Sequence, residues 1–287
     1  MKAEVRCGAM KSTLTILLLT ACGGKAPLPP MATSGSDTGE ATDLVTPGLV
    51  PIEGGRYFLG EWDELVIVNF DGNGEDAQTI IPEASIQVDG FWIDRYPFPG
   101  IPGDDWFVDG LNLPLVVALD SWLQEYGRRA CTISELLLAG AGPDNHRYPY
   151  GSGIYDPNAC DGDDANPEPI GSFPDCVSST GVRDFQVRST WGALDREIVS
   201  IMKETPQAEG FPGDHEYAVW GGTSRTDTFY APNNFGFHLH GPDDVAYQDD
   251  GFRVCAGPNP PSEAQDTAYA LWLDNVRSAG SFAGIFE

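Results

Sequence analysis

Four cysteines beyond residue 130 constrain the fold of this chain more than any other feature of its sequence. Four thiols can pair in three ways if all of them oxidise. Cys160 and Cys176 flank a loop rich in Asp, Asn and Pro, and a bond between them would close that loop. The remaining bond, Cys131–Cys255, would tie the middle of the chain to its last predicted strand. We expect both disulfides, with zinc as the weaker alternative because no close CxxC spacing is present.

The N-terminus predicts the oxidising destination in which such disulfides persist. An apolar run at residues 14–21 follows Lys11 and ends at Cys22. It is too short to cross a bilayer core of ~30 Å as a helix and is typical of a cleaved signal. Residues 19–22 (LTAC) resemble the bacterial lipobox, which implies that the Cys22 thiol is diacylated and becomes the first residue of the mature protein. The alternative is an ordinary hydrophobic N-terminus.

These features predict three segments around a central domain. A lipoprotein signal peptide is expected at residues 1–21, followed by a flexible tether at residues 22–47, where Gly, Pro, Ser and Thr leave too little apolar surface to offset the entropy of ordering. Residues 48–258 are expected to form the folded domain, and residues 259–287 a C-terminal helical tail. We expect the protein to be exported and lipid-anchored in the bacterial cell envelope, at the outer membrane.

The charge balance restricts the partners of the chain. It has 43 acidic and 16 basic residues, which gives a net charge of −27. Such a charge repels phosphate backbones and anionic membrane surfaces, so nucleic acid is excluded as a partner and contact with the membrane is expected only through the lipid anchor. The charge favours cations or cationic surfaces, although a purely solubilising shell would give the same composition.

Short apolar stretches separated by Gly, Pro, Asp and Asn predict an α+β domain with low regular secondary structure. Val116, Leu119 and Leu123 lie on one stripe of a predicted helix over residues 115–126, and a capping box at Thr132–Glu135 predicts a second helix that ends near residue 140. Further helices are expected at residues 194–203 and 262–278. Strands are expected at residues 66–68, 86–88, 91–93, 217–220, 235–240 and 251–255.

Six segments, taken in order, resemble the formylglycine-generating enzyme family, also called the sulfatase-modifying factor domain. They read VPIEGGRYFLG, FWIDRYP, RACTISELLLA, YPYG, WGGT and GFR, against the family's VPIPGGxFxMG, FxIDxYPVTN, RLPTEAEWEYA, YPWG, RGGS and GFR. The resemblance covers residues 49–255. It implies a heavily decorated, C-type-lectin-like α+β fold, whereas function must be argued from the site.

The site residues differ from those of the catalytic members of that family. Formylglycine-generating members bind copper(I) through two cysteines that follow the RGGS segment. The corresponding positions here are near Thr226 and Ala231, and no cysteine lies between Cys176 and Cys255. Copper(I) prefers soft thiolates, so we expect no copper, no formylglycine-generating oxidase activity and no catalytic residue of that kind.

Calcium is the cofactor that the sequence favours. The resemblance places a calcium site close to the loop between Cys160 and Cys176, and hard oxygen donors of the kind that calcium binds are dense there. The candidate ligands are Asn158, Asp161, Asp163, Asp164, Asn166 and Glu168. A solvated acidic loop is the alternative. A second calcium site of the family is expected to be lost, because residues 186–192 lack its asparagine and glutamate.

Two functions remain as hypotheses. The first is a non-catalytic binding or structural module for an envelope protein, peptide or glycan, with Trp220, Phe229 and Tyr230 as candidate ligand anchors. The second is a divergent metal-dependent oxidoreductase built around His238 and His240, whose i, i+2 spacing on a strand directs both rings to one face. The missing copper cysteines favour the first.

Overall fold

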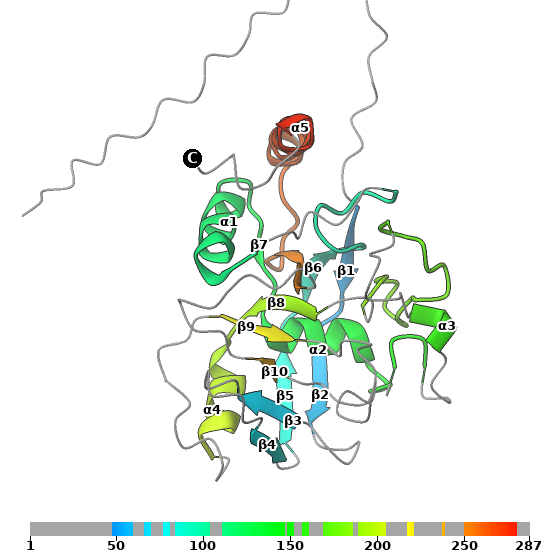
Figure 1. Cartoon of the computed structure of the whole chain (residues 1–287), viewed down its shortest axis with the longest axis vertical. Helices are drawn as coiled ribbons and strands as arrows, with labels where there is room; N and C mark the ends of the chain where they lie inside the picture. Colours follow the sequence, from blue (N-terminus) through cyan, green and yellow to red (C-terminus); the bar gives the residue numbers. More distant parts are fainter. Residues whose placement is uncertain are drawn as a thin grey trace, which may run out of the picture. The chain divides into compact units, whose positions relative to one another are not determined.

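Short strands and a few helices make up the computed structural model of the protein, shown in Figure 1. It describes residues 48–59, 66–69, 77–80, 84–103, 111–146, 148–151, 157–160, 169–185, 189–204, 217–220, 237–238 and 250–279. All of them lie in one unit, residues 43–287. The helices are α1 (Leu113–Glu125), α2 (Ile133–Ala141), α3 (Pro157–Cys160), α4 (Arg196–Glu204) and α5 (Glu263–Ala279). The described part of the chain is therefore a mixed α+β fold.

One four-stranded antiparallel sheet brings together strands that lie far apart in the sequence. We call it sheet A. Its strand order is β1–β6–β12–β7, so that the last strand lies between two much earlier ones. Cys255 pairs with Ile93 on one side and with Arg129 on the other. The strands are β1 (Leu49–Ile52), β6 (Phe91–Asp94), β7 (Arg129–Ala130) and β12 (Val254–Ala256).

The remaining described strands form two further sheets. Sheet B is an antiparallel pair of β2 (Gly55–Leu59) and β5 (Ala84–Val88). In β5, Ile86 and Val88 are buried, and Gln87 between them is exposed. Sheet C has the order β11–β8–β9–β10–β3–β4, with parallel pairing at β11/β8 and β10/β3. Its strands are β3 (Val66–Asn69), β4 (Ala77–Ile80), β8 (Ser189–Ala193), β9 (Tyr217–Trp220), β10 (Phe237–His238) and β11 (Asp250–Phe252).

Helix α1 follows the sequence signals that predict it. The Asn112 side chain accepts a hydrogen bond from the Leu115 backbone N–H, and a proline stands in the first turn, where its missing N–H costs nothing. The predicted stripe of Val116, Leu119 and Leu123 is fully buried. The helix ends where Gly127 adopts a left-handed φ of 69°, which a glycine adopts without steric cost.

Helix α2 is the central element of one of two hydrophobic clusters. All nine of its residues are buried, and it contacts β2, β5, β8 and α4. The predicted capping box is confirmed: Thr132 Oγ1 accepts from the Glu135 N–H, and the Glu135 carboxylate accepts from the Thr132 N–H at 2.8 Å. The cluster also includes Ile93, Phe185 and Ile198.

The single strand predicted over residues 251–255 is wrong, because the chain changes sheets in the middle of it. Residues up to Phe252 pair with β8 in sheet C, and residues from Val254 pair with β6 and β7 in sheet A. At the change, the Phe252 carbonyl accepts from the Phe98 N–H and the Arg253 carbonyl from the Cys131 N–H. These partners lie outside β8 and so end the first ladder.

The predicted C-terminal helix, α5, packs onto the domain through its aromatic residues. Tyr269 and Trp272 are buried in the second hydrophobic cluster. Their rings lie within 5.9 Å of the Tyr126 ring, centroid to centroid, at the end of α1. Trp272 also stacks on Trp122. Although the sequence suggests a tail, this helix completes a core, and its apolar face stabilises the domain.

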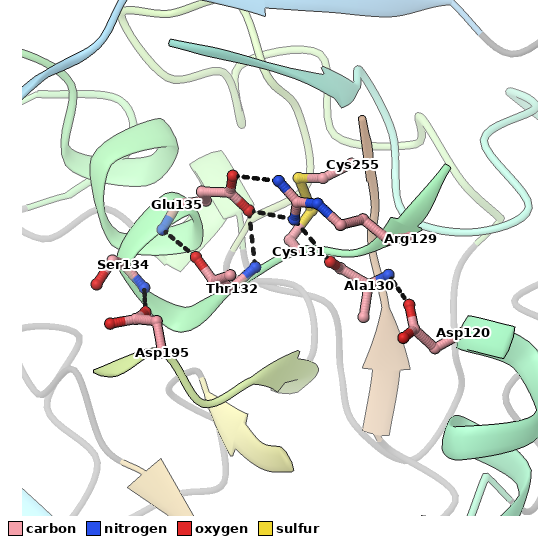
Figure 2. Close-up of polar contacts among 9 residues, drawn as sticks. All are labelled: Asp120, Arg129, Ala130, Cys131, Thr132, Ser134, Glu135, Asp195 and Cys255. Carbon is pink, nitrogen blue, oxygen red and sulfur yellow. Dashed lines mark hydrogen bonds and ion pairs between the residues drawn. A yellow bond between two sulfur atoms is a disulfide. The ribbon is translucent and has the colours of Figure 1, made fainter. Parts of the chain in front are cut away.

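One carboxylate caps two helices. Asp195 Oδ1 accepts from the Ile198 N–H in the first turn of α4, and Oδ2 accepts from the Ser134 N–H in the first turn of α2 at 2.9 Å (Figure 2). Its negative charge lies at the positive ends of both helix dipoles. The relative position of α2 and α4 therefore depends on this side chain.

Asp195→Ala is expected to lower the free energy of unfolding by about 2 kcal/mol, because a lost cap typically costs about 1 kcal/mol and two are lost here. Urea denaturation followed by circular dichroism measures the change. Asp144→Ala is the control, since Asp144 is an exposed loop aspartate. Equal stabilities of the two variants would contradict the shared-cap interpretation.

Candidate functional site

The start of α2 gathers polar contacts from several segments (Figure 2). The Arg129 guanidinium donates to both carboxylate oxygens of Glu135, at 2.7 and 2.6 Å. Glu135 also accepts from the Thr132 backbone, so one carboxylate joins β7 to the first turn of α2. Nearby, Asp120 of α1 accepts from the Ala130 N–H and from the Tyr217 hydroxyl. These contacts orient β7 between α1 and α2.

The disulfide Cys131–Cys255 lies at the same junction, with its Cα atoms 4.8 Å apart. It joins the residue after β7 to β12 within sheet A. The Cys131 carbonyl accepts from the Ala193 N–H of β8, so the same residue also contacts sheet C. Both cysteines are fully buried. The disulfide therefore ties two neighbouring parts of sheet A, and the hydrogen bond from Ala193 connects the same residue to sheet C.

A second polar group is buried beneath sheet A. Arg253 is fully buried and donates to the carbonyl oxygens of Asp94 and Arg183. Its guanidinium lies 4.3 Å from the centroid of the Phe185 ring. Asp184, also buried, accepts from the Gly171 N–H at 2.7 Å. Arg253 thus connects its own segment to those of Asp94 and Arg183.

Burial and neighbouring charges shift the pKa values of this group in opposite directions. Burial lowers the pKa of Arg253 to about 10, and the charges of Asp184 and Asp94 oppose that shift. Burial raises the pKa of Asp184, against the hydrogen bond from Gly171 and the charges of Arg253 and Arg183. Burial therefore disfavours the charged forms of both side chains, and the nearby opposite charges offset only part of that cost.

These charged side chains do not form an open reactive centre. Arg128, Arg253, Asp94 and Asp184 are each at most 2% exposed. Arg128 contacts the Asp94 and Asp266 carboxylates, Arg253 contacts two backbone carbonyls, and Asp184 accepts from the Gly171 N–H. A catalytic acid, base or nucleophile must reach a substrate, whereas these groups are enclosed. Their role is to position strands and helices. Asp94 and Arg253 lie in the segments FWIDRYP and GFR, but the sequence alone does not predict this role for them.

The predicted disulfide Cys160–Cys176 is present, with its Cα atoms 4.6 Å apart. It fixes the ends of the loop in which calcium ligands are expected. Asn158 lies in α3, where the structure describes only its backbone. The other candidate ligands, Asp161, Asp163, Asp164, Asn166 and Glu168, lie outside the described residues.

The candidate binding residues fall partly within sheet C. Trp220 ends β9 and His238 ends β10, and these strands pair so that His238 lies opposite Val219. The pairing brings two predicted ligand-binding positions onto adjacent strands. Phe229, Tyr230 and His240 lie outside the described residues, as do the segments around Thr226 and Ala231.

Within the described residues, no group of three or more His, Cys, Asp or Glu side chains is arranged to hold a metal ion. Among the helices of this part of the chain, none is both long and apolar enough to cross a membrane. Apart from Asn158, the residues proposed for calcium binding and for membrane anchoring lie outside the part described.

Comparison with known proteins gave no match to the chain, either among protein-family models or among curated protein sequences.

Arg253→Met is expected to lower the free energy of unfolding by about 3–5 kcal/mol, the usual cost of removing one partner from a buried charged group. The change removes the Arg253 donor from the Asp94 and Arg183 carbonyls and removes one of the two cations that act on Asp184. Chemical denaturation measures it. Arg95→Met is the matched control, because the Arg95 side chain is exposed, and it should change stability by no more than about 0.5 kcal/mol.

Proposed function

We propose that this chain is a cell-envelope lipoprotein whose domain, residues 48–258, is a divergent member of the formylglycine-generating enzyme family. The domain acts as a non-catalytic binding or structural module. Its ligand is an envelope protein, a peptide or a glycan.

The positions of the resembling segments in the fold support the proposal. The first segment contains most of β1, the second contains β6 and the third begins with β7, and all three strands lie in sheet A. The last segment, GFR, ends β11 of sheet C, and its arginine directly precedes β12, the strand of sheet A between β6 and β7. The first two segments pair with each other, and the Arg253 carbonyl accepts from the Cys131 N–H of the third, so these segments are also neighbours in the fold.

The side chains within those segments have structural roles. Glu135 closes the capping box, and Arg253 connects three segments. A Cβ on Gly54 would lie 2.6 Å from the Gly90 backbone nitrogen, so only glycine fits the close approach of these two turns. The residues on which the resemblance rests therefore have roles in folding. They support a shared fold and give no support for the copper-dependent reaction of the family.

One observation carries the non-catalytic interpretation. All four cysteines that follow Cys22 are joined in the two disulfides, Cys131–Cys255 and Cys160–Cys176. Since the Cys22 thiol is acylated in the proposed mature chain, no free thiolate remains for copper(I). Thiolates are the ligands that this ion needs. The residues present therefore do not fit the family's copper centre, and no reaction step through copper is assigned.

Replacing Cys22 with Ser is expected to abolish lipid labelling and to leave the unprocessed precursor, because the thiol is the acylated group. Metabolic labelling with a radioactive or clickable fatty acid, followed by gel analysis, measures both effects. Cys7→Ser is the control, since Cys7 precedes the predicted cleavage site and should leave labelling unchanged. Lipid on the Cys22→Ser protein would contradict the anchor.

The domain is also expected to bind calcium through the loop that Cys160–Cys176 closes. Saturating calcium should stabilise the folded form by RT ln(1 + [L]/Kd), about 2.7 kcal/mol at a hundredfold excess over Kd. Asp163→Ala with Asp164→Ala should remove most of that gain in scanning calorimetry of metal-stripped protein. The control, Asp89→Ala with Asp144→Ala, removes the same charge from exposed positions outside the loop.

The same samples separate binding from catalysis. Copper-reconstituted protein is expected to leave a cysteine-containing peptide unoxidised. Turnover of the peptide would overturn the non-catalytic interpretation and favour the divergent oxidoreductase. The absence of any calcium-dependent stabilisation would remove the calcium site and leave the fold assignment unaffected.

A further inference from the structure

Arg128 joins helix α5 to the interior of the domain. One terminal nitrogen of its guanidinium donates to Asp94 of β6 at 3.0 Å, and the other donates to Asp266 of α5, also at 3.0 Å. The same guanidinium lies 4.2 Å from the centroid of the Tyr269 ring, one turn further along α5. A single cation thus holds two carboxylates, one on the core sheet and one on the terminal helix.

The two carboxylates are in very different surroundings. The side chain of Asp94 is 0% exposed, whereas that of Asp266 is 36% exposed. Only one oxygen of Asp94 bonds to Arg128, and within the described part of the protein its other oxygen, Oδ2, has no hydrogen-bond partner. An ionised carboxylate in such a position lacks solvation on one side. Asp94 is therefore the member of the group that gains most from a proton.

The groups that face Asp94 come from each element packed against it. Arg128 precedes β7, Arg253 lies between β11 and β12, and α5 contributes Asp266 and Tyr269. Burial raises the pKa of Asp94 to about 6, against the lowering effects of Arg128 and Arg253. The negative charge of Asp266 raises it further. Part of the shift thus depends on α5 being in place.

We propose that Arg128 couples protonation of Asp94 to the docking of α5, so that mild acid holds this helix more firmly on the domain. When Asp94 takes up a proton, it no longer competes with Asp266 for the Arg128 cation. The guanidinium is then available to the α5 carboxylate, and the unpaired oxygen of Asp94 no longer belongs to a buried negative charge.

The direction of the effect follows from linkage. Docking of α5 brings Asp266 towards Asp94 and makes Asp94 bind a proton more readily, so by reciprocity the proton favours the docked helix. The folded-state pKa of Asp94, about 6, is higher than the ordinary aspartate pKa of 3.8. The stabilisation is therefore gained as the pH falls from about 6 towards 4, and it is absent at higher pH.

Hydrogen exchange of the full-length protein tests the proposal. After correction for intrinsic exchange rates, the α5 amides are expected to gain about fivefold or more in protection between pH 7.5 and 5.0, the lower end of typical coupling between linked sites. The α2 amides serve as the internal reference and should gain less. Asp94→Asn should remove the gain in α5, because the amide does not titrate.

Two further variants keep the test decisive if Asp94→Asn fails to fold. Asp266→Asn removes the α5 carboxylate at a partly exposed position and should reduce the gain. Asp274→Asn, an exposed aspartate on the same helix, should retain it. The proposal is overturned if wild-type protection in α5 does not change, if α2 gains as much as α5, or if Asp266→Asn behaves like Asp274→Asn.

Discussion

The junction between Cys131 and Arg253 is the constraint on which the rest of the structure depends. The Cys131 N–H donates to the Arg253 carbonyl, and the Cys131 carbonyl accepts from Ala193 of β8. The disulfide to Cys255 joins the same place covalently. Sheet A, sheet C and α2 all meet here, so the position of each depends on a few consecutive peptide groups.

Buried charge gives this junction its specificity. Apolar side chains of similar volume could replace a complete buried ion pair at little cost in stability, whereas removal of one partner alone is destabilising. They could not select Asp94, Arg183 and Asp266 as neighbours. The guanidinium groups restrict which segments can meet, and because no described strand is longer than five residues, such restrictions replace long ladders of backbone hydrogen bonds. We infer that fold specificity, more than stability, explains their burial.

The sequence predicted the features whose partners lie close together in the chain. The capping box of Thr132 and Glu135 and the apolar stripe of α1 are confirmed because each depends on residues within two turns of helix. Arg128 could not be assigned in this way. Its partners Asp94 and Asp266 lie 34 and 138 residues away, and 43 acidic residues compete for the role.

The candidate site shows the same division. Strands over residues 217–220 and 235–240, which contain Trp220 and His238, were predicted from local composition. Their pairing as neighbours was not predicted, since sheet C combines strands from distant parts of the chain. The change of sheet at Arg253 was missed for the same reason. The local sequence of residues 251–255 gives no sign that the Phe252 and Arg253 carbonyls will bond to Phe98 and Cys131 instead of to one neighbouring strand.

The Cys160–Cys176 disulfide has a consequence for how this protein can vary. It holds two residues that are 16 apart in sequence at a Cα separation of 4.6 Å, so the two ends of the intervening segment meet at one point of the domain. A segment anchored in this way can change in length or composition with only a slow rise in closure entropy, while the core beside it receives the same two attachment points. The ring is thus a natural place for insertion of a foreign peptide, and related chains could diverge there in ligand preference while keeping one scaffold.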